Sequence, residues 1–165
     1  MNGNHDLCAD GDPEQTLVAD RYGSIVDLYV LLQRPDGKIL LLERSGTGYA
    51  DGQLCPPSGH LEEGESVVQG VAREAREETG VLIEPGDLVF RHVIHHRNPL
   101  GQARIGFFFT ATRWQGVPTN TEPHKCAGLS WVDPARPPAN TVPYTAAALA
   151  AITRGAPFSL DGWPG

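Results

Sequence analysis

Residues 59–81 read GHLEEGESVVQGVAREAREETGV, and this stretch decides the fold of the chain. Its second half has the features of a helix with defined ends. Ser66 is a good N-cap residue, and Gln69 three positions later completes a capping box. Gly80 follows the last helical residues, at the position where a left-handed backbone costs glycine least. The sequence therefore predicts a helix that begins after Ser66 and ends before Gly80.

Apolar and acidic residues occupy neighbouring faces of this helix. Glu74, Glu77 and Glu78 stand at i, i+3 and i+4, so their carboxylates project within an arc of about 100°. A solvated acidic face is the plainer explanation for such a run. This arc, however, borders the apolar stripe, which consists of Val67, Val68, Val71, Ala72 and Ala75. Carboxylates crowded at the edge of a core repel one another unless a cation neutralises them, and Mg²⁺ prefers oxygen ligands of this kind.

The same stretch resembles the Nudix box, Gly-x5-Glu-x7-Arg-Glu-U-x-Glu-Glu-x-Gly-U, in which U is an apolar residue. All the defined positions are filled, by Gly59, Glu65, Arg73, Glu74, Ala75, Glu77, Glu78, Gly80 and Val81. A motif with this many fixed positions is far more specific than a lone glycine pattern. The resemblance implies an α/β fold, the Nudix-type α/β/α sandwich with a mixed sheet, over residues 23–154.

Composition limits the classes of partner. The chain has 165 residues, enough for one domain with a sizeable core, and a net charge of −7. That charge disfavours a nucleic-acid polymer or an anionic membrane as the main partner, but a bound metal reverses the local sign for a nucleotide. Cys8, Cys55 and Cys126 lack a C-x-x-C spacing and indicate a reducing compartment. With no signal-peptide pattern and no long apolar run, we expect a soluble, cytoplasmic protein; its oligomeric state stays open.

The remaining segments predict strands around the box helix. Residues 25–32 and 38–42 are β-type runs, and Pro35-Asp36-Gly37 between them favours a hairpin. Further along, the pattern predicts a brief strand at 81–84, antiparallel strands at 88–96 and 104–114, a short strand at 129–132 and a helix at 144–154. Residues 1–22 are a polar N-terminal tail, and the more apolar residues 155–165 are expected to pack on the domain.

The resemblance also implies roles for individual residues. Hydrolysis of a phosphoanhydride needs the phosphate charge neutralised and a water oriented and deprotonated. The family's metal ligands correspond to Glu74, Glu77 and Glu78, with backbone oxygens of Ser58 and Gly59 as further ligands. Glu74 is a candidate base, although some members place the base outside the box. Arg73 orients a box carboxylate and Glu77 is its natural i+4 partner. Mg²⁺ is the expected cofactor, with Mn²⁺ as a second candidate.

Glu122 is the catalytic candidate outside the box. Residues 120–126 read NTEPHKC and resemble the Asn-x-Glu-Pro-Glu-Lys-Cys segment of some nucleotide-hydrolysing Nudix proteins, with His124 in place of the second Glu. A loop that folds over the box helix would add Glu122 to the carboxylates, as a ligand or as the base. An ordinary surface acid is an equally weighted alternative, because loops carry function but are mostly just polar.

Three basic or ring-bearing residues are candidates for contacts to the substrate: Arg44, His60 and His95. Arg44 stands at the end of a strand shortly before the box, where a guanidinium could meet phosphate. His60 and His95 are candidate pocket residues, since imidazole suits Zn²⁺ better than Mg²⁺ and no cysteine has zinc-like spacing. A solvated arginine is the alternative for Arg44, and a metal-binding role is the alternative for the histidines.

The expected function is a Mg²⁺-dependent Nudix pyrophosphohydrolase that cleaves a phosphoanhydride of a nucleoside triphosphate or another nucleoside diphosphate derivative. Its partner is then a nucleotide-type small molecule. Two alternatives stay open: a hydrolase of ADP-ribose, a nucleotide sugar or a dinucleotide, and a Nudix module that binds a nucleotide without hydrolysing it. The intact box disfavours the latter. The sequence does not name the base, sugar or leaving group, because variable loops make those contacts.

Overall fold

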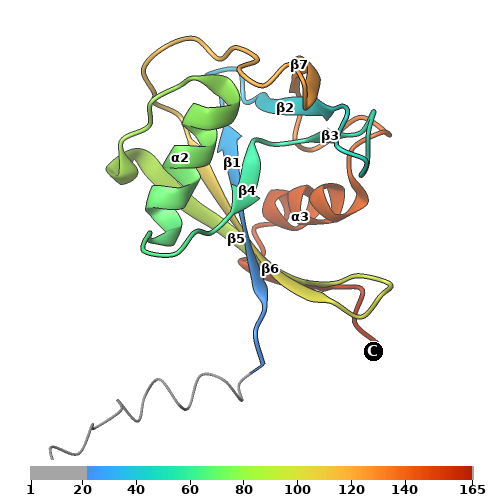
Figure 1. The fold of residues 1–165 in the computed structure, drawn as a ribbon. Coiled ribbons are helices and arrows are strands. Elements are labelled where there is room, and N and C mark those ends of the chain that lie inside the picture. The colour runs from blue at the N-terminus through green and yellow to red at the C-terminus, as the bar shows by residue number, and fades with distance from the viewer. Residues whose placement is uncertain (1–21, 165) are drawn as a thin grey trace, which may run out of the picture.

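The computed structural model describes residues 22–164, whose strands form two sheets (Figure 1). The larger sheet has the order β4–β1–β6–β5–β8, with bounds Ser58–His60, Ile25–Leu32, Ala103–Ala111, Leu88–Arg97 and Phe158–Asp161. The smaller sheet has the order β3–β2–β7, with bounds Leu54–Cys55, Ile39–Arg44 and Cys126–Val132. Helix α2 spans Val67–Thr79, helix α3 spans Pro143–Thr153, and a 3₁₀ turn covers Pro85–Asp87.

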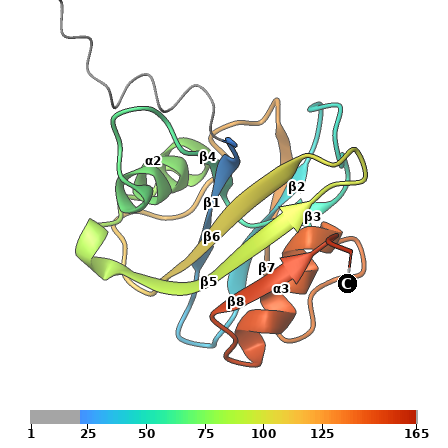
Figure 2. The same ribbon diagram turned by 90° about the horizontal axis from the view of Figure 1, so that it is seen from below.

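The larger sheet is mixed and lies between the two helices. Strand β1 is parallel to β6 and antiparallel to β4, while β5 is antiparallel to β6 and parallel to β8. Figure 2 shows α2 and α3 on opposite sides of this sheet. The α/β class, with a mixed sheet flanked by helices, is therefore confirmed.

Alternation along β1 explains the two cores. Leu28 and Val30 point to one face and pack with Val71 of α2, whereas Leu31 points to the other face and packs with Leu149 of α3. Successive side chains of a strand point to opposite faces, so a strand buried on both sides reads as a continuous apolar run. Each helix thus has its own core, and β1 is shared between them.

Helix α2 begins and ends where the sequence predicts. The Ser66 side chain accepts from the backbone N–H of Gln69, and the Gln69 side chain accepts from the backbone N–H of Ser66. Gly80 caps the other end with φ 73°, and its N–H donates to the carbonyl of Arg76. These caps fix where the acidic side chains of the last two turns lie.

The predicted hairpin is wrong, although its turn is present. Gly37 has φ 84°, its N–H donates to the Arg34 carbonyl, and the Arg34 N–H donates to the Lys38 carbonyl. The strands then separate into different sheets, joined at this turn by a single bridge between Gln33 and Ile39. Turn chemistry is local, whereas pairing depends on which neighbours bury each strand.

Two further strand predictions had different outcomes. The predicted antiparallel neighbours are confirmed as β5 and β6. The predicted strand at 81–84 is wrong, because this segment makes only an isolated bridge between Leu82 and Gln115 before the 3₁₀ turn. Val81 and Ile83 are nevertheless buried in the core under α2. The apolar pattern of this segment therefore reflects side-chain packing and not pairing with a neighbouring strand.

The C-terminal segment of the chain forms a strand of the larger sheet, whereas most of the N-terminal segment lies outside the described residues. The predicted tail at residues 1–22, including Cys8, lies outside the described residues apart from Tyr22. At the other end, β8 pairs with β5 through Val93–Phe158 to His96–Asp161. Within residues 22–164, neither helix is long and apolar enough to cross a membrane.

Candidate functional site

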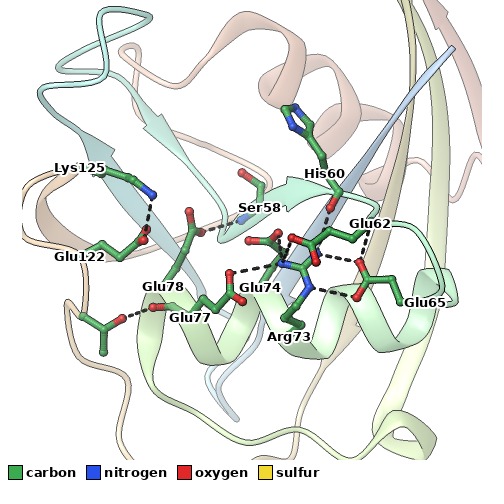
Figure 3. Close-up of polar contacts among 11 residues, drawn as sticks. Ser58, His60, Glu62, Glu65, Arg73, Glu74, Glu77, Glu78, Glu122 and Lys125 are labelled. Atoms are coloured by element: carbon green, nitrogen blue, oxygen red, sulfur yellow. Dashed lines mark hydrogen bonds and ion pairs between the residues drawn. The ribbon is translucent and has the colours of Figure 1, made fainter.

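Strand β4 holds the carboxylates at the C-terminal half of helix α2 (Figure 3). The backbone N–H of Ser58 donates to Glu78 Oε2 at 2.7 Å. Gly59 lies directly under the carboxylate of Glu74, so closely that a Cβ atom at this position would overlap it. A side chain at position 59 would therefore displace the Glu74 carboxylate from its place in the site.

Arg73 connects the acidic residues to the strand. Its Nη1 donates to Glu74 Oε1 at 2.6 Å and to Glu77 Oε2 at 3.3 Å. Its Nη2 donates to the backbone carbonyl of His60 at 3.0 Å. This geometry is consistent with the prediction that Arg73 orients box carboxylates. The guanidinium donates hydrogen bonds to oxygens of Glu74, Glu77 and His60.

Glu65 is bound to the same guanidinium on its other side. Arg73 Nε and Nη2 donate to Glu65 Oε2 and Oε1 at 3.0 and 2.7 Å, a bidentate pair. The Glu62 backbone N–H adds a third hydrogen bond at 2.9 Å. Hydrogen bonding from Arg73 is the main cause that lowers the pKa of the Glu65 carboxyl. Glu65 therefore belongs to the framework of the site and is fully compensated.

Glu74 and Glu78 are in the opposite electrostatic state. Burial is the main cause that raises the pKa of Glu74, and neighbouring Glu77 and Glu122 raise it further. Burial raises the pKa of Glu78 to about 8, with additional repulsion from Glu74 and Glu122. Desolvation and like charges both disfavour the ionised form. Arg73 offsets part of this shift at Glu74, whereas Glu78 has no ion-pair partner among the described residues, so a cation bound nearby would favour the ionised form of Glu78.

The loop that carries Glu122 is attached to the end of helix α2. The Thr121 hydroxyl donates to the carbonyl of Glu77, and the Thr119 N–H donates to the carbonyl of Thr79 at 3.0 Å. Glu122 is paired with Lys125 at 2.9 Å. The structure therefore brings Glu122 to the box carboxylates, as expected if it contributes to the site.

A small pocket opens beside these carboxylates. Its lining contains both acidic and basic side chains and is formed by Leu42, Arg44, Cys55, Glu78, Glu122, Lys125 and Cys126. The sequence interpretation did not single out Lys125 as a site residue, although its i+3 spacing from Glu122 was visible. Cys55 and Cys126 are buried free thiols at this wall, and burial raises the pKa of both.

The three candidate substrate residues have different positions. Arg44 lines the pocket, but its Nε donates to the Tyr49 carbonyl at 3.0 Å and its Nη2 to the Thr47 hydroxyl at 3.1 Å, so it also holds that loop. His60 lies next to the box carboxylates through its backbone, while its ring points away from them (Figure 3). His95 lies on β5, two strands from β1, and its ring packs on Trp163. The structure does not bring His95 to the cluster.

Comparisons with known proteins fit this geometry. A family model described as a NUDIX domain matches residues 24–151. The chain belongs to the Nudix hydrolase family. A curated relative from Bacillus subtilis (strain 168), an uncharacterized Nudix hydrolase, is 34% identical over 100 residues, which are 59% of this chain and 60% of the relative. The match thus covers less than two thirds of that Nudix relative's length.

Solved Nudix structures share the fold. A MutT NUDIX hydrolase from Burkholderia pseudomallei superposes with a TM-score of 0.69 at 26% identity, covering 78% of this chain and 97% of the other. A MutT protein from Methanosarcina mazei Go1 superposes with a TM-score of 0.66 at 24% identity, covering 81% and 96%. The Nudix-type sandwich is therefore the fold of this chain.

Nudix hydrolases use divalent cations, and the donor set of this chain suits one. Within residues 22–164, no three His, Cys, Asp or Glu side chains converge closely enough to hold a metal as they stand. Arg73 instead occupies oxygens of Glu74 and Glu77. The fit rests on chemistry: the groups are carboxylates, hard oxygen donors, and the pKa of the half-buried Glu78 carboxyl is raised by desolvation and by like charges.

Proposed function

We propose that this chain is a Mg²⁺-dependent pyrophosphohydrolase that cleaves a phosphoanhydride of a nucleoside triphosphate or another nucleoside diphosphate derivative. The observation that carries the proposal is the grouping of the buried Glu74 and the half-buried Glu78 with Glu77 and Glu122, with fewer cations than carboxylates around them. A purely structural helix end gains nothing from such an arrangement, because buried like charges cost stability.

The side chains divide the work by position. Glu74, Glu77 and Glu78, with backbone oxygens of Ser58 and Gly59, would hold the metal. A bound divalent cation supplies Lewis-acid polarisation of a phosphoryl oxygen and makes the attacking water easier to deprotonate. Mn²⁺, with the same preference for oxygen ligands, would substitute for Mg²⁺.

A carboxylate next to the reacting water acts as the general base in this proposal. Glu74 and Glu122 are the two candidates, since both lie at the cluster and neither is part of the closed Glu65–Arg73 pair. Arg73 holds Glu74 in place through a 2.6 Å hydrogen bond. Lys125 and Arg44 line the pocket beside Glu78 and Glu122 and would meet the phosphates, which carry the charge that these cations attract.

Two other activities remain candidates. The same cluster serves a hydrolase of ADP-ribose, a nucleotide sugar or a dinucleotide, because the phosphoanhydride is common to all of them. A Nudix module that binds a nucleotide without turnover is the third. Residence in the cytoplasm stays a prediction.

One substrate screen tests the proposal. Nucleoside triphosphates, nucleotide sugars, ADP-ribose and dinucleotides are each incubated with the protein and Mg²⁺, and phosphate and pyrophosphate are measured separately. We expect metal-dependent turnover of at least one class, lost in EDTA and restored by Mg²⁺ or Mn²⁺. Nucleotide binding by calorimetry with no turnover of any class would favour the binding module and overturn the hydrolase.

A further inference from the structure

A partly buried ion pair lies on the sheet face opposite helix α2. Asp27 on β1 is only 4% exposed, and Arg104 on β6 donates to both of its carboxylate oxygens, each at 2.6 Å. The parallel β1–β6 register places Arg104 beside Ile25, two residues before Asp27, from where its side chain reaches the carboxylate. Such a bidentate pair has a fixed geometry, so it offers a rigid point to which another group can attach.

His60 is the group attached to this pair. Its Nε2 lies 2.7 Å from Arg104 Nη2 and 3.4 Å from Asp27 Oδ1. A guanidinium only donates, so the imidazole Nε2 accepts the hydrogen bond from Arg104. The side chain is 66% exposed, which means that surrounding apolar packing does not fix it. The contact with the ion pair is what orients this ring.

Strand β4 carries His60 and is only three residues long. Each of its residues contacts a different member of the carboxylate site: Ser58 donates to Glu78, Gly59 lies under Glu74, and the His60 carbonyl accepts from Arg73. The strand stands at the edge of the larger sheet, next to β1. A short edge strand has few ladder hydrogen bonds, and a slip of one residue would move every side chain to the other face.

We propose that Asp27 and Arg104 are positioning residues for the carboxylate site, acting through His60 to hold strand β4 in register. The ion pair on one face of the sheet thereby fixes the backbone that supports Glu74 and Glu78 on the other face. Within residues 22–164, neither Asp27 nor Arg104 forms a hydrogen bond or an ion pair with Glu74 or Glu78. The catalytic consequence rests on the proposed function, whereas the effect on strand β4 does not.

Amide hydrogen exchange tests the strand directly. Arg104→Lys keeps the positive charge next to Asp27. It removes the planar guanidinium, which donates to Asp27 and to His60 simultaneously. We expect the N–H groups of Ser58 and Leu61, which bond to Glu78 and to the Val26 carbonyl, to exchange about five-fold faster or more. Arg91→Lys is the matched control, because it removes a cross-strand bond to Thr110 far along the β5–β6 pair and should leave β4 unchanged.

A second variant guards against misfolding. Asp27→Asn combined with Arg104→Gln removes both charges, so no unpaired charge stays buried. It should show the same faster exchange at residues 58–61. Exchange at these amides equal to wild type in both variants would overturn the proposal and leave the ion pair with a structural role only.

Metal affinity and kinetics then test the link to the site. Partners that orient metal ligands typically contribute 10- to 100-fold, so we expect Arg104→Lys to weaken Mn²⁺ binding and to lower kcat by about 10-fold, with KM nearly unchanged. Combining Arg104→Lys with His60→Gln should add little beyond either single change, because both act through one contact. Additive losses would show that Arg104 does not act through His60.

Failure of the two proposals is distinguishable. If wild-type protein hydrolyses no substrate, the proposed function fails, while exchange at residues 58–61 still decides the positioning role. If wild type is active and Arg104→Lys keeps wild-type kcat, Mn²⁺ affinity and exchange rates while its Tm falls, the positioning role fails and the proposed function stands.

Discussion

The two ends of helix α2 carry glutamates in opposite electrostatic states. Before its N-terminus, Glu65 accepts two hydrogen bonds from Arg73 and one from a backbone N–H, and the pKa of its carboxyl is lowered. In the last turn, Glu78 is half-buried and accepts the Ser58 N–H, and desolvation raises its pKa to about 8. The negative end of the helix dipole opposes carboxylates there as well.

The difference shows that the role of a glutamate in the motif depends on its surroundings and not on its residue type alone. Glu65 has its donors in place and needs nothing more, so it stabilises the fold. Glu78 has no ion-pair partner among the described residues, and the charge of Lys125 offsets its raised pKa only in part, so a further cation would favour its ionised form. The four expected outcomes below separate the two ends, from the largest effect to the smallest.

Glu77→Gln should remove activity and leave the fold intact. The carboxamide keeps the shape but loses the charge needed to bind a divalent cation, so kcat should fall by about 10²-fold or more. The Glu77 side chain is half exposed, so circular dichroism and Tm should stay close to wild type. Glu63→Gln, an exposed acid in the loop before α2, is the control. An unchanged kcat would contradict the metal assignment.

Glu122→Gln should give a smaller loss at the same end of the helix. If Glu122 is a ligand or the base, kcat should fall about 10- to 100-fold with little change in KM. Loss of the 2.9 Å pair with the half-exposed Lys125 should change stability little. An active variant of wild-type Tm would remove Glu122 from the site.

The metal-free protein should lose stability as pH rises, and Glu78 should be a cause. Its pKa is raised to about 8 in the folded state, against about 4.5 in the unfolded chain. The folded state then holds the proton more tightly, so this contribution is full below pH about 4.5 and is lost as pH rises through about 8.

The variant Glu78→Gln cannot titrate at this position. In EDTA, its Tm should exceed that of wild type by several degrees at pH 8.5, and the gap should shrink towards pH 5. Mn²⁺ should stabilise wild type more at pH 8.5 than at pH 6, because the ligand is then ionised. Thermal unfolding at three pH values measures both effects. A gap independent of pH would show that Glu78 ionises normally.

Ser66→Ala should affect stability alone. It removes the side-chain acceptor of the capping box at the N-terminal end, which costs about 1 kcal/mol. Because this end of α2 is remote from the proposed chemistry, kcat per folded molecule should stay within about two-fold of wild type. Denaturant unfolding and kinetics on one preparation measure both. A kcat loss comparable to that of Glu77→Gln would show that the two ends are not independent.

Local signals in the sequence were sufficient for the helix and its acidic arc. Ser66, Gln69 and Gly80 act within a few residues of themselves, so their caps were predictable from spacing. The grouping of Glu74, Glu77 and Glu78 follows from helix geometry in the same way. The Nudix resemblance then supplied the fold and the roles.

Contacts between residues far apart in the sequence could not be predicted from local patterns. Pro35-Asp36-Gly37 predicted the turn but not that β1 pairs with β6 while β2 pairs with β7, since those partners are more than 60 residues away. The Asp27–Arg104 pair joins residues 77 positions apart, and each alone has the appearance of an ordinary strand charge. His95 was a candidate from its residue type alone, and which strand lies next to the box depends on the sheet order.

The crowding at Gly59 has a consequence for how this chain tolerates change. Gly80 favours glycine because of its own backbone, at φ 73°, whereas Gly59 favours glycine because the neighbouring Glu74 carboxylate fills the adjacent space. The first constraint is set mainly by the local backbone conformation. The second is conditional: a side chain at position 59 requires the Glu74 carboxylate to move or residue 74 to be shorter, so a substitution at position 59 should cost less activity after residue 74 has already changed.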